Sequence, residues 1–307
     1  MTEFLQQILN GLALGAIYAL IALGYTMVYG VLRFINFAHS DIFMLGAFSG
    51  FYLEKLFARY FASAFPPQSI TAAIIIMLLS MAICAALGVA IEYLAYRPLR
   101  KRPRLTVLIT AIGVSLFIEY TCQHPAVFGP SPQAFPKLLP EQTLNLGGVV
   151  MSSNQVVIFV VTGILLVLLT FIVQRTKVGM AMRAVSFNER AAALMGVNVD
   201  RIVSFTFALG SALAAAGGIL FAIKYQKIEP LMGVQMGLKA FVAAVLGGIG
   251  NLPGACLGGL VLGLVESAVG GVARLSTYRD GVAFAFLIAV LLFRPDGLLG
   301  KATKEKV

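Results

Sequence analysis

The chain has 307 residues, of which 59% are hydrophobic and only 12% are charged. Its mean hydropathy is +0.91, whereas a water-soluble domain carries roughly twice that share of charged residues. A water-soluble fold is therefore excluded. The formal net charge of +10 does not indicate nucleic-acid binding, because the basic residues lie between apolar segments, where positive charge sets the orientation of membrane helices.

Nine apolar segments are long enough, or nearly long enough, to cross a bilayer. They are continuous and rich in Leu, Ala and Val, which favours helices over the alternating strands of a membrane β-barrel. The first segment follows no basic stretch, so we interpret it as a retained span and not as a signal peptide. The segments are 5–31, 35–53, 70–95, 105–123, 155–174, 203–223, 235–250, 254–272 and 280–294.

Basic residues gather in three places and predict the orientation of the chain. If all three clusters and Arg33 are cytoplasmic, fifteen of the 23 Lys and Arg residues lie inside. This arrangement requires an outside N-terminus, an inside C-terminus and an odd number of spans, which nine satisfies. The clusters are Arg97, Arg100, Lys101, Arg102 and Arg104; Arg175, Lys177, Arg183, Arg190 and Arg201; and Arg294, Lys301, Lys304 and Lys306.

We therefore expect an all-α polytopic membrane protein, a bundle of about eight to nine transmembrane helices forming one domain over 1–307. Segment 235–250 is the weakest span, because it is short and runs into Gly247, Gly248 and Gly250. It is either a full span or a re-entrant or broken helix, which is tolerated only beside protein or a water-filled cavity. The segment 124–152, with five prolines, is the longest predicted outside loop.

Small residues recur at four-residue spacing, a pattern that lets helix backbones approach closely in a membrane. Ordinary tight packing and a functional role both remain open for them. The pairs are Gly11/Gly15, Gly46/Gly50, Gly254/Gly258 and Gly259/Gly263.

The sequence offers no constellation for catalysis or metal binding. Segment 295–302 comes nearest to a phosphate-binding loop, but it lacks the first glycine and the final Ser or Thr. His39 and His124 are the only histidines and form no metal-ligand spacing. We expect no enzyme activity, no bound cofactor and no metal in this chain.

A first polar cluster lies between the first two spans and contains Arg33, Asn36, His39, Ser40 and Asp41. Polar groups at membrane depth usually face a partner, water or the bundle interior. We interpret Asn36 as the N-cap of the second helix, with Asp41 in its first turns. A lined cavity or gate is the alternative, and for His39 and Asp41 both interpretations stay open.

Three acidic residues lie in the spans, namely Glu92, Glu119 and Glu266. They could mark a proton or ion path, although their spacing does not require one. For Glu92 we favour a structural pair with nearby Arg97.

A second polar cluster forms the loop at about 175–202. Its pattern predicts a short helix with Asn188 as N-cap, Glu189 in the first turn and Gly196 as terminator. Such a helix exposes Leu194 and Met195, and exposed apolar surface usually marks an interface. A peripheral partner is the favoured interpretation, and a helix lying among lipid headgroups is the alternative.

Residues 188–201, followed by the small-residue run 207–218, resemble the permease subunit of branched-chain amino-acid ABC importers of the LivH type. Further blocks that agree are 35–47, 95–99, 237–254 and 294–300, so the resemblance covers essentially the whole chain. It implies an ABC importer permease fold in the bacterial inner membrane, with a second, related permease, two cytoplasmic ATPases that use ATP and Mg, and a periplasmic binding protein.

In this family the inside loop is the coupling helix that sits in a groove of the ATPase. The role maps onto Asn188, Glu189, Arg190, Ala191, Ala192, Leu194, Met195 and Gly196. ABC importers often carry an acidic residue where this chain has Arg190, which puts a specific acidic contact in doubt. The family commonly has Ala-His-Gly-Glu where this chain has Ala38 to Asp41. Candidate residues for a translocation path or gate are Asn36, His39, Asp41, Gly247, Gly248 and Gly250.

The expected function is import of branched-chain amino acids delivered by the binding protein. The same machinery for urea, short amides or aromatic acids is a close alternative. A stand-alone channel or ion-coupled carrier is an alternative of a different class, since it would work without ATPase partners.

Overall fold

The computed structural model describes residues 2–61, 68–100, 102–146, 148–272, 274–294 and 296–300. Most of this part of the chain is helical, and each of the nine predicted apolar segments contains a helix, which confirms the all-α prediction. The long helices are α1 (Thr2–Leu32), α2 (His39–Tyr60), α3 (Ile70–Ile91), α4 (Arg104–Gln123), α5 (Ser153–Arg175), α8 (Val199–Tyr225), α9 (Met232–Gly247), α10 (Leu252–Gly270) and α11 (Arg279–Phe293). Two short helices, α6 (Lys177–Phe187) and α7 (Glu189–Leu194), lie between α5 and α8.

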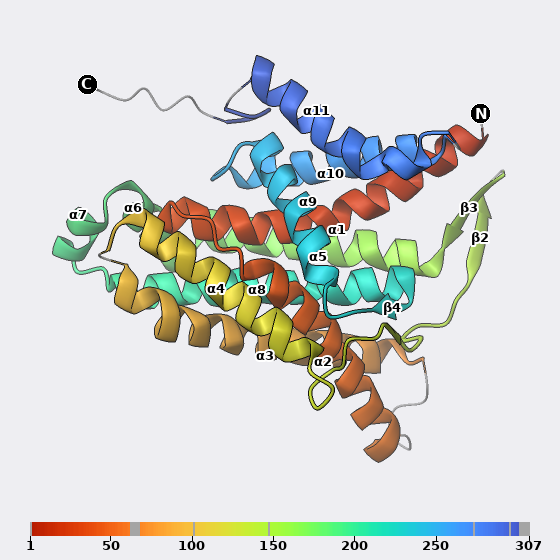
Figure 1. Ribbon diagram of the computed structural model, residues 1–307, viewed down its shortest axis with the longest axis horizontal. Helices are drawn as coiled ribbons and strands as arrows, with labels where there is room; N and C mark the ends of the chain where they lie inside the picture. Colours follow the sequence, from red (N-terminus) through yellow and green to blue (C-terminus); the bar gives the residue numbers. More distant parts are fainter. Residues whose placement is uncertain are drawn as a thin grey trace.

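The long helices run back and forth between two ends of the molecule (Figure 1). One end, the N-terminal end, joins the start of α1 to the strand β3 (Val149–Ser152), because Gln6 Nε2 donates to the Val150 carbonyl at 2.9 Å. The other, the α7 end, holds α6 and α7, and there Arg33 donates to the Ser186 carbonyl at 3.3 Å. The described ranges contain nine long helices, in line with the predicted eight to nine.

Seven of these helices are long and apolar enough to cross a membrane, when α3 and α11 are counted with the short helical turns that adjoin them, as Ile70–Leu99 and Ser276–Phe293. The other two are α2, which carries four charged residues, and α9, which has 16 residues. At 1.5 Å per residue α9 is about 24 Å long, shorter than the ~30 Å hydrocarbon core. It is one unbroken helix that ends at Gly247, so the glycine run ends the helix and does not interrupt it.

The loops predicted to be cytoplasmic meet at the α7 end. Arg100 in the loop after α3 lies 2.8 Å from Asp200 at the start of α8. The tail returns to the α9–α10 turn, where Leu298 N donates to the Leu246 carbonyl at 2.8 Å. Lys101, Lys301, Lys304 and Lys306 lie outside the described residues. The clustering of basic loops at one end therefore agrees with the positive-inside pattern of the sequence.

Glycines hold the centre of the bundle together. A Cβ at Gly15 would lie 2.7 Å from Leu260 Cα, and one at Gly263 would lie 2.3 Å from the Gly15 nitrogen. A Cβ at Gly46 would lie 2.4 Å from Ala215 Cα, so α2 approaches α8 in the same way. The small-residue pairs therefore pack helix backbones against each other, as expected in a membrane bundle.

The helices α3, α4, α5 and α11 expose long apolar faces. Leu78, Phe117, Val167 and Leu292, one on each of these helices, are all strongly exposed. In a membrane such faces are covered by lipid or by another membrane subunit. The core is thus formed mainly by α1, α2, α8, α9 and α10.

The predicted outside loop carries short strands that the sequence did not reveal. β2 (Thr143–Leu146) pairs antiparallel with β3, and β1 (Gln133–Ala134) pairs antiparallel with β4 (Lys227–Ile228), which follows α8. Glu141 accepts hydrogen bonds from Lys137 at 2.6 Å and from Gln226 at 2.8 Å. The bond from Lys137, with its positive charge, holds the pKa of Glu141 below its ordinary value.

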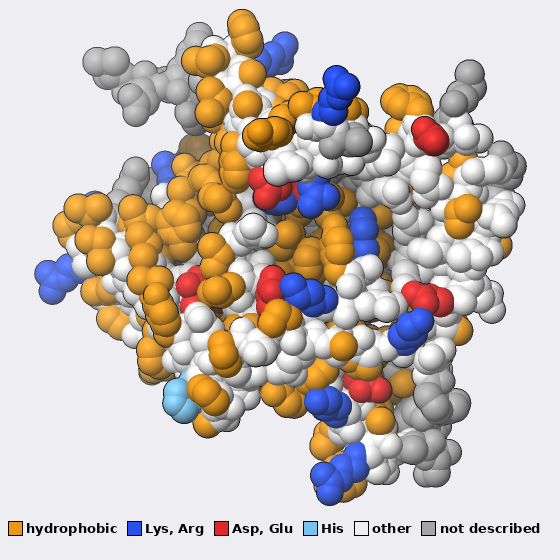
Figure 2. All heavy atoms as spheres, turned by 45° about the vertical axis from the view of Figure 1, so that its right-hand side comes forward, with side chains coloured by type: hydrophobic (Ala, Val, Ile, Leu, Met, Phe, Trp, Pro, Cys, Tyr) orange, Lys and Arg blue, Asp and Glu red, His pale blue; other side chains and the backbone are white. Residues whose placement is uncertain are grey.

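Figure 2 shows the molecule turned so that the N-terminal end comes forward. This face has a recess whose floor is largely apolar and whose margins carry acidic and basic side chains.

Candidate functional site

The predicted loop helix forms as α7, with the caps that the sequence indicated. The Asn188 side chain accepts a hydrogen bond from Ala191 N at 3.0 Å. Gly196 has φ +84°, and the bonds from Gly196 N to Ala193 O and from Val197 N to Ala192 O are both 3.0 Å. This is a Schellman ending, which a left-handed glycine allows. Asn188 as N-cap and Gly196 as terminator are confirmed.

A second short helix, α6, precedes α7 and was not expected. Its N-cap is Thr176, whose side chain accepts from Gly179 N at 3.1 Å. Arg183 and Gly179 hold α6 against the last turn of α5, since a Cβ at Gly179 would lie 2.2 Å from the Val173 carbonyl. The pattern of Thr176 followed by a helix-compatible run was the signal that could have revealed α6.

Together α6 and α7 project from the bundle (Figure 1, left). The side chains that they expose include large apolar ones. Phe187, Leu194 and Met195 are 88%, 89% and 85% exposed, and we call these three residues the α7 surface. Ala192 faces inward and is buried. Large apolar side chains at such exposure indicate an interface. The sequence analysis predicted that Leu194 and Met195 are exposed, but it did not identify Phe187 as part of this surface.

The α6–α7 unit is anchored to the end of α1. Ser186 Oγ donates to the Gly30 carbonyl, and Arg33, whose φ is +55°, reaches the Ser186 carbonyl. A displacement of α7 is therefore opposed by contacts to α1 as well as by its covalent link to α8.

The structure corrects the interpretation of Asn36. The residue before α2 is Ala38, which has no side chain for capping, and α2 begins at His39. Asn36 is buried, and its Oδ1 accepts a hydrogen bond from the Tyr96 hydroxyl at 2.6 Å. A buried amide oxygen needs a hydrogen-bond donor, and the Tyr96 hydroxyl supplies it. Asn36 therefore joins the segment before α2 to the segment after α3.

His39 and Asp41 are buried in the first turn of α2 but face different partners. His39 Nε2 lies 3.3 Å from the Ile21 carbonyl, and its ring meets Tyr25 edge-on at 4.7 Å. Asp41 Oδ2 accepts from the Ser115 hydroxyl at 2.6 Å. Asp41 Oδ1 is buried without a hydrogen-bond partner among the described residues. The predicted position of Asp41 in the first turn is confirmed.

Gly247, the last residue of α9, and Gly248 and Gly250, which follow it, lie at the α7 end. Gly248 and Gly250 have φ of +102° and +91°, which L side chains rarely adopt. A Cβ at Gly248 would lie 2.7 Å from the Gly300 nitrogen, so the tail packs directly on this turn. A Cβ at Gly247 would lie 1.9 Å from the Gly254 carbonyl.

A small apolar pocket lies between this glycine turn and the end of α1. Its lining residues include Tyr25, Ile35, Phe241 and Ile249. The turn and the segment that precedes α2 therefore meet at this pocket, although no hydrogen bond joins the glycines to Asn36, His39 or Asp41 among the described residues.

A buried ion cluster toward the N-terminal end was not predicted as a set. Lys239 Nζ lies 2.8 Å from Glu266 Oε1 and 2.7 Å from Asp280 Oδ1, the latter contact without hydrogen-bond geometry. Arg279 Nε lies 3.2 Å from Glu266 Oε1, and the Tyr18 hydroxyl donates to Glu266 Oε2 at 2.7 Å. Glu266 is thus fully paired, as charges inside a membrane protein usually are.

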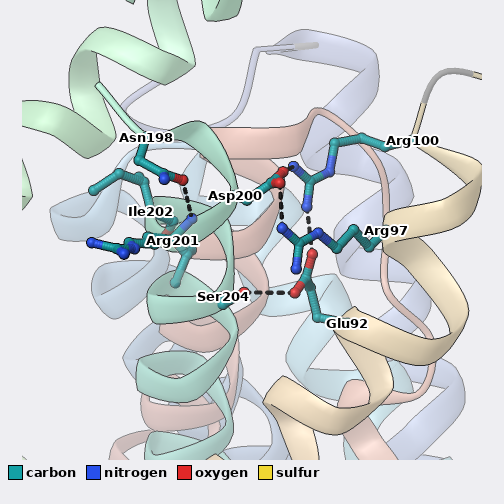
Figure 3. Close-up of polar contacts among 9 residues, drawn as sticks. Glu92, Arg97, Arg100, Asn198, Asp200, Arg201, Ile202 and Ser204 are labelled. Carbon is teal, nitrogen blue, oxygen red and sulfur yellow. Dashed lines mark hydrogen bonds and ion pairs between the residues drawn. The ribbon is translucent and has the colours of Figure 1, made fainter. Parts of the chain in front are cut away.

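A second ion network ties the end of α3 to the start of α8 (Figure 3). Glu92 pairs with Arg100, and not with Arg97 as the sequence suggested. Arg97 instead pairs with Asp200, which Arg100 also contacts. The Ser204 hydroxyl donates to Glu92 Oε2 at 2.7 Å. We call these five residues the arginine clamp.

The helices, their apolar faces and the paired intramembrane charges define a multi-pass membrane protein with a short capped helix projecting at one end. A family model described as branched-chain amino acid transport system, permease component, matches residues 7–291. The chain belongs to this family of permeases.

Full-length relatives support the assignment. The chain is 43% identical to the high-affinity branched-chain amino acid transport system permease protein BraD of Pseudomonas aeruginosa, over 99% of this chain and 98% of that protein. It is 41% identical to the corresponding LivH protein of Escherichia coli K12, with the same coverage. It is 28% identical to a probable LivH of Methanocaldococcus jannaschii, over 93% of this chain and 89% of that protein.

Proposed function

We propose that this chain is the membrane-spanning permease subunit of an ATP-driven importer of branched-chain amino acids. The support is its family, and the full-length similarity to permease proteins named for branched-chain amino acid transport. Amino acids of this class are zwitterions with apolar side chains, so a path for them needs little fixed charge. The scarcity of unpaired charge within the described bundle is compatible with that demand.

The observation that carries the ATP-driven mechanism is the α7 surface. The capped six-residue helix α7 and the residues beside it leave Phe187, Leu194 and Met195 exposed, and no described part of the chain covers these side chains. A groove on a cytoplasmic ATPase would bury these side chains, and each large apolar side chain contributes about 1.5–3 kcal/mol when fully buried. Residues 188–196 are then the coupling segment, which includes the exposed Arg190.

The remaining subunits follow from this arrangement. Two cytoplasmic ATPases would bind ATP and Mg, so this chain needs no cofactor and catalyses no hydrolysis itself. A second related permease would cover part of the exposed apolar helix faces, and a periplasmic binding protein would deliver substrate. The N-terminal end would face the periplasm and the α7 end the cytoplasm of the inner membrane, because the basic loops gather at the α7 end.

The polar groups at the start of α2 are proposed to line or gate the path. His39 and Asp41 are buried, Asp41 Oδ1 is unpaired in the described part of the chain, and Asn36 holds Tyr96 at the same place. The turn of Gly247, Gly248 and Gly250 lies beside the same helix ends and would flex or close with them. ATP-driven closure of the ATPase pair would move α7, and the bundle would alternate access.

Transport by the reconstituted complex tests the proposal. The chain, its partner permease and the two ATPases are placed in liposomes with the binding protein, and uptake of leucine, isoleucine and valine is compared with that of urea and an aromatic amino acid. We expect uptake only with ATP and the binding protein, and only of the branched-chain amino acids. Uptake by this chain alone would contradict the importer function, and preferential uptake of urea or the aromatic amino acid would contradict the substrate class.

A further inference from the structure

The arginine clamp forms a closed ring of contacts between two helices. The two carboxylate oxygens of Asp200 accept from different arginines, Oδ2 from Arg97 and Oδ1 from Arg100. Arg100 extends to Glu92, whose other oxygen accepts from Ser204, one turn beyond Asp200 on α8. Figure 3 shows these side chains converging between α8 and the end of α3. The ring fixes the first turns of α8 to the loop after α3.

The clamp extends from the surface into the bundle. The side chain of Asp200 is 47% exposed, whereas that of Glu92 is fully buried and that of Arg100 is 13% exposed. A buried carboxylate that loses its cationic partner is strongly destabilised. Separating Arg100 from Glu92 is therefore costly. When Asp200 moves and draws Arg100 with it, we expect Glu92 to follow.

The surface end of the clamp lies next to α7. Asp200 follows Gly196, which ends α7, by four residues, and the Asn198 side chain caps α8 by accepting from Arg201 N at 3.1 Å. Only a short, capped link therefore separates the α7 surface from Asp200. A displacement of α7 reaches the clamp before any other ion pair in the described part of the chain.

The buried end of the clamp lies close in sequence to Tyr96, which contacts the polar segment before α2. Glu92 begins a π-helical turn, Glu92–Tyr96. Such turns are rare and often occur at functional sites. Tyr96, at the other end of this turn, donates to Asn36 at the entrance to α2. A route thus runs from Asp200 through Arg100 to Glu92, along the backbone of the π-helical turn to Tyr96, and from the Tyr96 hydroxyl to Asn36.

We propose that the arginine clamp is the mechanical link that transmits movement of α7 to the start of α2, with Asp200 and Glu92 as positioning residues for energy coupling. The inference rests on the proposed function, because it takes α7 as the segment that the ATPase moves. It adds a specific route, in which α8 and the π-helical turn move together and carry Asn36 with them.

The test measures how much substrate enters per ATP hydrolysed in the complete reconstituted importer. Asp200→Asn keeps the shape of the side chain but removes the charge that both arginines need. We expect the variant to assemble and hydrolyse ATP, while substrate transported per ATP falls by about five-fold or more, the size of a typical coupling between sites. Asp200→Glu should recover most of the coupling, which mere loss of packing would not explain.

A matched control and a second variant keep the test decisive. Arg201→Gln removes a charge from the same turn of α8, but its side chain points away from the clamp in Figure 3 and should leave the ratio unchanged. Arg97→Gln breaks the exposed half of the clamp, and combined with Asp200→Asn it should add little, because both act on one link. All ratios are taken per assembled complex, so that a lower yield does not count as uncoupling.

An Asp200→Asn or Arg97→Gln complex that transports as much substrate per ATP as the wild type would overturn the clamp proposal. Failure of the proposed function looks different. In that case the wild-type complex itself would show no ATP-dependent uptake, whatever residue stands at 200.

Discussion

Gly263 and Gly196 show how differently the bundle centre and the α7 segment use the same amino acid. A Cβ at Gly263 would lie within 2.3 to 2.5 Å of three backbone atoms of α1, so this glycine provides space between two helices. A Cβ at Gly196 would meet nothing within 4 Å, but its φ of +84° requires a left-handed residue. The centre therefore depends on close packing, whereas α7 depends on local conformation and leaves its outer face free.

The largest effect on the chain's own stability is expected at the centre. Gly263→Leu would push α10 away from α1, because backbone atoms cannot move aside as a flexible side chain does. We expect little or no folded protein, measured as the yield of monodisperse chain in detergent. Gly163→Leu on α5, where a Cβ meets nothing within 4 Å, is the control. Equal yields for the two variants would show that the α1–α10 contact is not close-packed.

The next largest effect is expected in the buried ion cluster. Lys239→Met removes the buried cation that Glu266 and Asp280 share and leaves Glu266 only the half-exposed Arg279, so it should destabilise the chain by up to about 3–5 kcal/mol. The Lys239 and Glu266 side chains are only 5% and 2% exposed. Thermal unfolding in detergent measures the change. Lys227→Met is the control, because its pair with Glu229 is exposed and such pairs contribute about 0–1 kcal/mol. A loss no larger than the control's would mean that the cluster is already hydrated.

The features that the sequence predicted correctly are those set by nearby residues. The apolar length of each segment predicts its helix, and the N-cap Asn188 with the terminator Gly196 predicts both ends of α7. Each of these signals acts within a few residues along the chain. They needed no knowledge of the tertiary structure.

The errors concern partners that are distant in sequence. Asn36 stands just before a helix and so resembles an N-cap, but its partner Tyr96 is 60 residues away. Glu92 was assigned to the nearer arginine, whereas helical geometry brings Arg100 to it and leaves Arg97 for Asp200. Lys239 and Glu266 are 27 residues apart on different helices. Which charges meet inside a bundle depends on helix packing, which local patterns do not contain.

A smaller effect is expected at α7. Gly196→Ala places a Cβ on a left-handed residue and should cost about 1–2 kcal/mol of local stability in α7. Gly196→Asn should cost less, since Asn adopts this conformation more readily. Hydrogen exchange of the α7 amides measures the difference, with the amides of α10 as an internal reference. Identical exchange in both variants would show that the Schellman ending does not hold α7 in place.

The smallest effect on the chain's own stability is expected from the substitution that should most disrupt the complex. Leu194→Asp changes a side chain that is 89% exposed and touches no core residue, so thermal unfolding of the isolated chain should match the wild type within about 0.5 kcal/mol. The same charge, buried in an apolar groove of the ATPase, would lack a partner and abolish docking. Co-purification with the ATPases measures this, and Leu144→Asp, an exposed apolar residue of β2 at the N-terminal end, is the control. Normal docking and uptake in Leu194→Asp would mean that the α7 surface is not the ATPase contact. Unfolding at lower temperature in the isolated chain would instead mean that the surface belongs to the fold, and that α7 does not differ from the centre in the way proposed.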